Sequence, residues 1–221
     1  MKKLYTINTV NNAYDIIINP FGKPFAERNP DFEVYNILDD SLLSDTRAAG
    51  GVTSSVANRM LHYAKAAEES GADGVLVTCT SVVDGAFYIR DRIGIPCINI
   101  AEPVAEMAVD AGVRIGVMGT IPTSPGAIDK MIDIYAKKIG KKVEIVNKVV
   151  DGAFDVLCAG DRAKHDAMIC ETLYRFSKEV DVIAFAQISM SLLKHDPIDI
   201  PLLKIGDSGY DKIRDLINAR G

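Results

Sequence analysis

The sequence predicts an α/β fold of two similar lobes, each a parallel sheet flanked by helices, related by a pseudo-twofold axis. Two observations carry this prediction. Apolar runs of strand length alternate with helical patterns along the 221 residues, as in a parallel sheet with crossover helices. Three short stretches also recur after about half the chain, as a duplicated α/β unit would produce.

The repeat consists of three pairs of stretches, each holding a strand and the residues that follow it. "LYTINT" is matched by "IGVMGT", "GVLVTCTS" by "VIAFAQIS", and "GIPCINI" by "DIPLLKI". The offsets of 111, 108 and 105 residues equate Thr9 with Thr120, Cys79 with Gln187, and Pro96 with Pro201. We therefore expect residues 1–100 and 207–221 to form lobe one, and residues 101–206 to form lobe two.

The elements of lobe one follow from local signals. "MKKLYTINTV" indicates a first strand, because its polar residues interrupt the apolar core that a signal peptide needs. A helix is expected after Gly50-Gly51, where apolar residues recur at helical spacing until Ser70-Gly71. The strand Gly74 to Thr78 follows.

Lobe two is built in the same way. Pro103 indicates a helix start and Gly112 its stop, before a strand over Ile115 to Met118. Ser124-Pro125 predicts a second helix, which ends at Gly140. The last residues, 208–221, are expected to form a helix that packs back on lobe one.

Charge and hydropathy exclude several classes of partner. The net charge is -5 and no cluster of Lys and Arg is present, whereas a nucleic-acid surface needs a concentrated basic stripe. The longest uncharged stretch, Val182 to Leu193, is too short to cross a bilayer. We therefore expect a cytoplasmic protein that binds a small molecule and neither nucleic acid nor membrane.

The cysteines and histidines do not predict a metal site. Cys79, Cys97, Cys158 and Cys170 show no CxxC pairing, and reduced thiols fit a cytosolic protein. Cys97 and Cys170 are expected in the core, while Cys158 precedes a helix and could reach a cleft. His62, His165 and His195 are expected to be surface or capping residues.

Hydroxyl-bearing residues and a cysteine directly follow one apolar strand, in "VLVTCTSV". Ligands of parallel sheets collect at the carboxyl ends of the strands. If a helix begins near Val82, its N–H groups favour an anion there, such as a carboxylate, with Thr80 and Ser81 as further donors. The same helix end favours the thiolate form of Cys79. From these residues alone, Cys79 is either a reactive thiol or a small core residue.

This stretch resembles the aspartate/glutamate/hydantoin racemase superfamily when taken with three further features. These are the "GT..T" turn at Gly119, Thr120 and Thr123, the "NT" at Asn8-Thr9, and the two-lobed repeat. The resemblance runs over nearly the whole chain. "DDSLLSDTRAAGGVTSSVA" is similar to the segment before the cysteine strand in the branch that holds arylmalonate decarboxylase and maleate isomerase.

The resemblance implies a cofactor-independent enzyme whose active site lies between the two lobes. Two cysteines, one from each lobe, then face opposite sides of a carbon next to a carboxylate, and one removes a proton while the other returns one. Cys79 matches the lobe-one cysteine, and Thr80 and Ser81 match residues that hold the substrate carboxylate. The remaining matches, which line the substrate cleft, are Asn8, Thr120 and Thr123.

One position departs from this pattern. The place of the second cysteine carries Gln187, whose amide can neither take a proton from carbon nor return one at neutral pH. We expect Gln187 and Ser189 to bind substrate from lobe two.

Several functions therefore stay open. Racemisation or isomerisation of a small carboxylate, such as an amino acid or related acid, is the leading hypothesis. A one-cysteine lyase that decarboxylates and then protonates is a second, and a catalytically silent carboxylate-binding protein is a third. The resemblance also implies a homodimer.

Overall fold

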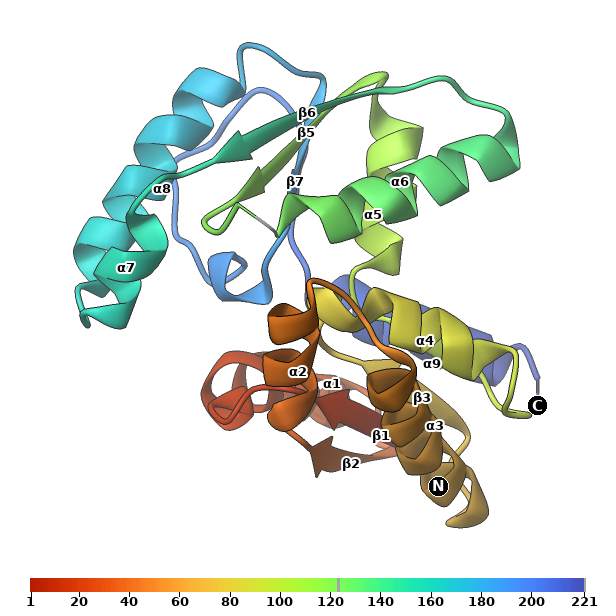
Figure 1. The fold of residues 1–221 in the computed structure, drawn as a ribbon. Helices are drawn as coiled ribbons and strands as arrows, with labels where there is room; N and C mark the ends of the chain where they lie inside the picture. The colour runs from red at the N-terminus through yellow and green to blue at the C-terminus, as the bar shows by residue number, and fades with distance from the viewer. Residues whose placement is uncertain (123, 221) are drawn as a thin grey trace. The chain divides into compact units, whose positions relative to one another are not determined.

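The computed structural model describes residues 1–122 and 124–220, and the chain divides into two compact units. Unit 1 contains Met1–Ala101 and Gly206–Gly221, and unit 2 contains Glu102–Ile205. Each unit holds a four-stranded, entirely parallel sheet. Figure 1 draws the strands as arrows and the helices that flank them as coiled ribbons. The predicted α/β class with two parallel sheets flanked by helices is confirmed.

The sheet of unit 1 has the order β2-β1-β3-β4. Its strands are β1 (Lys2–Asn8), β2 (Phe32–Leu38), β3 (Gly74–Val77) and β4 (Cys97–Asn99). β3 is buried along its whole length, because helices cover both faces of the sheet. Such a central strand reads as a continuous apolar run, which explains why "GVLV" was recognisable in the sequence.

The helical elements of unit 1 connect these strands. They are η1 (Tyr14–Gly22), α1 (Lys23–Arg28), α2 (Ser41–Ala49), α3 (Ser54–Glu69), η2 (Thr80–Val82), α4 (Val83–Arg90) and α9 (Asp207–Asn218). The side chain of Thr53 caps α3 by accepting a hydrogen bond from Val56 N at 3.2 Å. Met60 and Ala64, one turn apart on α3, are fully buried in the core with Val75 and Val77 of β3. This face of the sheet lies beneath the segment that carries Cys79.

Helix α9 belongs to unit 1, although unit 2 separates it from the rest of that unit in the sequence. It packs on β3 and β4, and Figure 1 shows it in blue beside elements of unit 1 coloured red to yellow. Tyr210 and Ile213 are fully buried, and Ile217 fills the space that Gly74 leaves by having no side chain. The helix therefore completes the second face of the sheet.

The glycine that introduces this helix cannot be replaced easily. Gly206 has a φ of 141°, a conformation that side-chain-bearing residues rarely adopt, and a Cβ there would lie 2.4 Å from the ring of Phe21. The chain can turn into α9 against Phe21 only because residue 206 has no side chain.

Unit 2 repeats the plan with the sheet order β6-β5-β7-β8. Its strands are β5 (Arg114–Gly119), β6 (Glu144–Val149), β7 (Val182–Phe185) and β8 (Leu202–Leu203). Its helical elements are α5 (Glu102–Ala111), α6 (Pro125–Ile139), α7 (Ala153–Cys158), α8 (Arg162–Phe176) and η3 (Ile188–Met190). Phe176 of α8 is buried against one face of this sheet with Ile183 and Phe185.

The strand ladders confirm all three offsets of the sequence repeat. Ile7 lies opposite Val77 in unit 1, and Met118 lies opposite Phe185 in unit 2, which gives offsets of 111 and 108. Val75 is paired with Cys97, and Ile183 with Leu202, which gives 108 and 105. The two units are thus built on one template.

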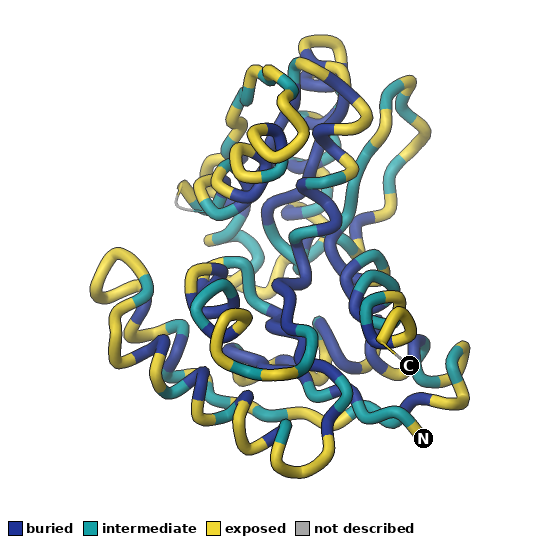
Figure 2. The backbone as a smooth tube through the Cα atoms, turned by 90° about the vertical axis from the view of Figure 1, so that its right-hand side faces the viewer, coloured by how far each residue is buried: buried dark blue, intermediate teal, exposed yellow. Residues whose placement is uncertain are grey.

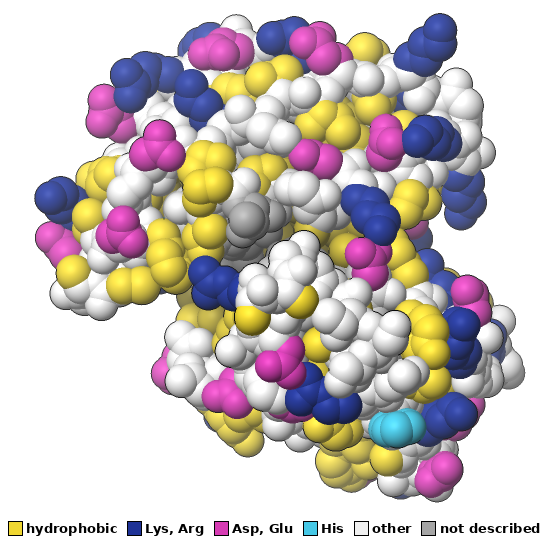
Figure 3. All heavy atoms as spheres, in the orientation of Figure 1, with side chains coloured by type: hydrophobic (Ala, Val, Ile, Leu, Met, Phe, Trp, Pro, Cys, Tyr) yellow, Lys and Arg dark blue, Asp and Glu magenta, His cyan; other side chains and the backbone are white. Residues whose placement is uncertain are grey.

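Burial follows the helical and strand periods in both units. In Figure 2 the helices alternate between buried and exposed turns, while long buried runs mark the central strands. Within the described residues, every helix is too short or too polar to span a bilayer. On the face drawn in Figure 3, acidic and basic side chains are interspersed.

Candidate active site

The carboxyl end of β3 carries Cys79 at the start of a helical segment. The strand ends at Val77, the η2 turn follows Cys79, and α4 continues from it, so the predicted helix start near Val82 is confirmed. Cys79 has an extended backbone (φ -122°, ψ 124°) and is half-buried against the core of unit 1. Cys79 is therefore partly exposed, while its backbone is fixed by the strand and the turn.

Asn99 fixes the backbone of the cysteine from the neighbouring strand. Its fully buried side chain donates from Nδ2 to the carbonyl oxygen of Cys79 at 2.8 Å, and its Oδ1 accepts from Ala101 N at 3.1 Å. A buried amide with both ends engaged holds a rigid geometry. Sequence reasoning missed Asn99, although its place at the end of the strand beside β3 was a usable signal.

Asn8 lies at the carboxyl end of β1 but is engaged within unit 1. It is fully buried, its Nδ2 donates to Thr6 Oγ1 at 2.8 Å, and its Oδ1 lies 2.9 Å from the hydroxyl of Thr78. These contacts link β1 to β3. Its role in substrate binding stays a prediction, and the partners it has favour a structural role at the strand ends.

The next residue, Thr9, was not singled out for this site. Its hydroxyl is buried, and no hydrogen-bond partner for it lies within residues 1–122 and 124–220. A buried hydroxyl without a partner is uncommon.

A polar cluster at the end of β2 fixes α2, which packs on the η2 turn after Cys79. Asp39 accepts hydrogen bonds from the Ser41 backbone at 3.0 Å and from the Tyr63 hydroxyl at 2.8 Å, and it lies 3.5 Å from Arg59. Arg59 also donates to Ser41 Oγ at 2.7 Å and pairs with Asp45. Burial alone would raise the pKa of Asp39, but these hydrogen bonds and the Arg59 charge outweigh it and hold the pKa below its ordinary value.

Removing one of these donors should destabilise the protein in a pH-dependent way. Because the folded pKa of Asp39 is depressed, its stabilisation is fully present above the unfolded pKa of about 3.9 and is lost as the pH falls through the folded value. Tyr63→Phe should lower the free energy of unfolding by about 1 kcal/mol near neutral pH, and by less in acid.

Urea unfolding near neutral pH and in acid measures this difference in the free energy of unfolding between the variant and the wild type. Tyr88→Phe is the matched control, since the Tyr88 hydroxyl donates to the uncharged Asn58 at 3.0 Å. If Tyr63→Phe lowers the free energy of unfolding equally at neutral and acidic pH, the hydrogen bond to the ionised Asp39 does not account for the loss.

The carboxyl edge of the sheet in unit 2 carries Gln187 in the same position. Gln187 precedes η3 in an extended conformation (φ -137°, ψ 137°), and its carbonyl accepts from Met190 N just as that of Cys79 accepts from Val82 N. The structure therefore equates Gln187 with Cys79 in backbone conformation as well as in register.

The side chain of Gln187 is held by its own unit. Its Oε1 accepts from the backbone N–H of Thr120 at 2.7 Å and from the Thr120 hydroxyl at 3.0 Å. The hydroxyl of Ser124 lies 3.2 Å away and also donates to Ile121 O at 2.8 Å. Two of the residues predicted for the site, Thr120 and Gln187, are thus in contact. Thr123, which was also predicted for it, lies outside the described residues.

Ser189 lies within the η3 turn and is half-buried. Its backbone carbonyl accepts from Arg162 Nη2 at 3.3 Å, and Arg162 in turn pairs with Asp166 at 3.2 Å. Sequence reasoning missed Arg162, because nothing in the helical pattern of α8 shows that its first residue reaches the end of β7. In unit 1, Thr80 is half-buried and Ser81 is exposed.

The other cysteines do not share the position of Cys79. Cys97 is buried in β4, as expected, and Cys158 is exposed at the end of α7. Cys170 is half-buried in α8, and burial raises the pKa of its thiol, so it is a poor nucleophile.

One histidine differs from its expected place. His165 was expected on the surface, but it is 1% exposed, with Nδ1 lying 2.7 Å from Asp166 Oδ1. The helical pattern placed it among charged neighbours, and the fold of α8 onto the sheet buries that turn. Over residues 1–122 and 124–220, no group of three or more His, Cys, Asp or Glu side chains could hold a metal ion.

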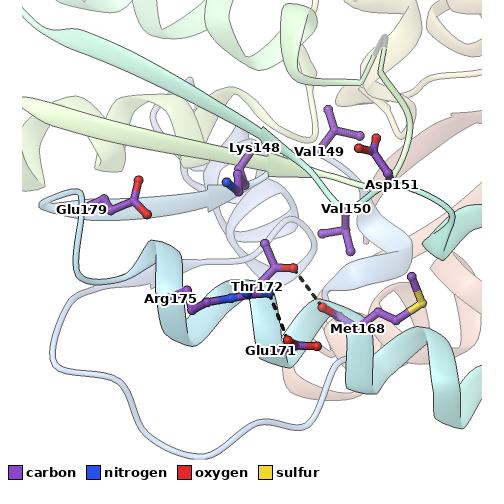
Figure 4. A pocket seen from close by; sticks show the side chains of 9 residues that line it. All are labelled: Lys148, Val149, Val150, Asp151, Met168, Glu171, Thr172, Arg175 and Glu179. Atoms are coloured by element: carbon purple, nitrogen blue, oxygen red, sulfur yellow. Dashed lines mark hydrogen bonds and ion pairs between the residues drawn. The ribbon is translucent and has the colours of Figure 1, made fainter.

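A separate hollow of about 380 Å³ lies in unit 2 between α8 and the end of β6 (Figure 4). Charged side chains of both signs line it, and Arg175 pairs with Glu171 at 3.1 Å. Its lining contains no cysteine or histidine and none of the predicted site residues.

Comparisons with known proteins agree with this architecture. The chain is similar to a Yersinia pestis protein assigned as an Asp/Glu racemase, with a TM-score of 0.75 at 18% identity, covering 99% of this chain and 100% of that one. It is similar to allantoin racemase from Klebsiella pneumoniae, with a TM-score of 0.70 at 18% identity over 100% and 89% of the two chains. For glutamate racemase from Bacillus anthracis the TM-score is 0.68 at 13% identity, over 100% and 83%.

These structural likenesses at low identity establish the shared fold. A comparison with curated protein sequences gave no match. The model of the Asp/Glu/Hydantoin racemase family matches residues 26–203, which include Cys79, Thr120 and Gln187. Because this match covers most of the chain, the protein belongs to the Asp/Glu/Hydantoin racemase family.

Proposed function

We propose that the protein is a racemase-type enzyme that acts on a small carboxylate without a cofactor and transfers the proton through Cys79. One observation carries the proposal. Cys79 is a half-buried cysteine at the carboxyl end of a central strand, directly before a helical segment, and Asn99 fixes its backbone from the neighbouring strand. In this proposal Thr80 and Ser81 hold the substrate carboxylate.

The reaction is a reversible proton transfer at the carbon next to the carboxylate. The thiolate of Cys79 takes the proton, the C–H electron pair moves into the carboxylate as an enediolate, and a proton is then returned to carbon. The helical segment after Cys79 favours a bound anion, because its first N–H groups carry partial positive charge. Asn8, Thr120, Thr123, Gln187 and Ser189 are the further residues proposed to bind substrate.

A second function is favoured by one specific observation. Gln187 stands where unit 1 has its thiol, so a single thiol serves proton transfer. A lyase that removes carbon dioxide from a malonate-type acid needs only one proton donor for the resulting enediolate. The substrate class is thus either an amino acid or related acid for racemisation, or a malonate for decarboxylation.

Isotope exchange in heavy water separates these functions. Amino acids, hydantoins, substituted malonates and maleate are incubated with the protein, and deuterium on carbon is measured by mass spectrometry and proton NMR. A racemase-type enzyme should place deuterium next to the carboxylate without loss of mass from the skeleton, whereas a lyase should give a deuterated monoacid.

Binding without any exchange over the whole panel would contradict both enzymatic functions and favour a silent carboxylate-binding protein. A homodimer and a cytoplasmic location stay predictions of the same proposal, as does the absence of nucleic-acid and membrane partners.

A further inference from the structure

The side-chain orientation of Gln187 is fixed by the chemistry of its neighbours. A backbone N–H can only donate, so the atom 2.7 Å from Thr120 N must be the amide oxygen. The Thr120 hydroxyl at 3.0 Å adds a second hydrogen bond to the same atom. The amide is therefore anchored at its oxygen.

The backbone of this region is shaped to allow the contact. A Cβ on Gly119 would lie 2.2 Å from Ser124 Oγ and 3.4 Å from Gln187 Oε1. Any side chain at residue 119 would displace the Ser124 hydroxyl from the amide. Gly119 thus leaves the room that the Ser124 hydroxyl occupies beside the amide.

The consequence concerns the other end of the amide. With Oε1 bound to Thr120, the two hydrogens on Nε2 are directed away from this anchor, and they make no hydrogen bond within the described residues of unit 2, 102–122 and 124–205. Gln187 is half-buried at the carboxyl edge of its sheet, where ligands of parallel sheets bind. An anchored amide with a free NH2 group is a preorganised donor for a ligand oxygen.

We propose that Gln187 determines substrate specificity by donating a hydrogen bond from Nε2 to a carboxylate oxygen of the substrate. The donor then stands at the strand-end position of unit 2 that is equivalent to that of Cys79 in unit 1. The inference rests on the proposed function, since it assigns Gln187 to the carboxylate substrate of that enzyme. The hydrogen bond from Gln187 Nε2 then favours acids that carry an oxygen acceptor for this amide, such as dicarboxylates.

The sequence offers a direct spectroscopic test, because Gln187 is the only glutamine in the chain. Selective ¹⁵N labelling of glutamine gives one side-chain NH2 signal. Titration of the full-length protein with malonate, and separately with L-aspartate, should shift this pair of resonances along a saturable curve. A pair that stays in place while calorimetry shows either probe binding would overturn the proposal, and so would the failure of both probes to bind.

Two variants test the donor itself. Gln187→Glu keeps an acceptor oxygen for Thr120 but replaces the NH2 group by a second oxygen, and Gln187→Met removes both while keeping the length. Each should weaken malonate binding by about tenfold or more, because a hydrogen bond to a charged group is lost. Binding within twofold of wild type in both variants would refute the role.

Asn218→Asp serves as the charge control for Gln187→Glu. Asn218 is exposed and accepts from Lys2 Nζ at 2.5 Å, a contact that a carboxylate retains. This variant should bind malonate like the wild type. Since binding is measured without turnover, a failure of Cys79 chemistry and a failure of this inference give different results.

Discussion

Cys79→Ala is expected to reduce the rate of isotope exchange at the substrate carbon by at least about 10²-fold, because it removes the group that carries the proton. Alanine keeps most of the small apolar volume of the half-buried side chain. Asn99 contacts the backbone carbonyl of residue 79, so its hydrogen bond is retained in the variant. The free energy of unfolding should therefore change by less than about 1 kcal/mol.

The measurement compares exchange rates in heavy water with thermal unfolding followed by circular dichroism. Cys158→Ala is the matched control, because it removes an exposed thiol of unit 2 and should leave exchange unchanged. Alkylation at neutral pH should likewise inactivate the wild type and be slowed by a bound dicarboxylate. Exchange within about tenfold of the wild type in Cys79→Ala would exclude the thiol from proton transfer.

Gln187→Cys is expected to create a second proton-transfer group. The ladders and the two turns make residue 187 the counterpart of Cys79. The N–H and hydroxyl of Thr120, which now bind Oε1, would be available to stabilise a thiolate there. Interconversion of enantiomers at saturating substrate should rise by about tenfold or more.

The same variant loses the Nε2 donor, so KM should rise while turnover increases. Chiral chromatography with deuterium analysis measures both quantities. Ser189→Cys is the side-by-side control, since its counterpart in unit 1 is Ser81 and not Cys79. If interconversion of enantiomers rises in Ser189→Cys but not in Gln187→Cys, then Ser189 and not Gln187 is the residue of unit 2 that meets the substrate carbon.

The fold was predictable because its signals are local. "GVLV" is a continuous apolar run, and Pro96 and Pro201 precede equivalent strands, so the offsets could be read from the sequence. The position of Cys79 between a strand end and a helical turn was predictable because strand ends and helix starts are visible in the sequence.

The contacts of the site were less predictable because they join residues that are far apart in the chain. Asn99 and Cys79 meet only because β4 lies beside β3, and Gln187 reaches Thr120 across two neighbouring strands. The direction in which an amide points depends on donors that no periodicity reveals. His165 was placed wrongly for a similar reason, since its burial depends on how α8 packs.

The return of α9 to unit 1 has a consequence for the order of events during synthesis. Unit 2, Glu102–Ile205, is continuous, so all of its strands leave the ribosome before α9 does. Unit 1 lacks Tyr210, Ile213 and Ile217 until all of unit 2 has been made, and until then α9 cannot cover β3 and β4. The half that is made first should therefore be completed last, and the nascent N-terminal half should depend on chaperones for longer than its place in the chain suggests.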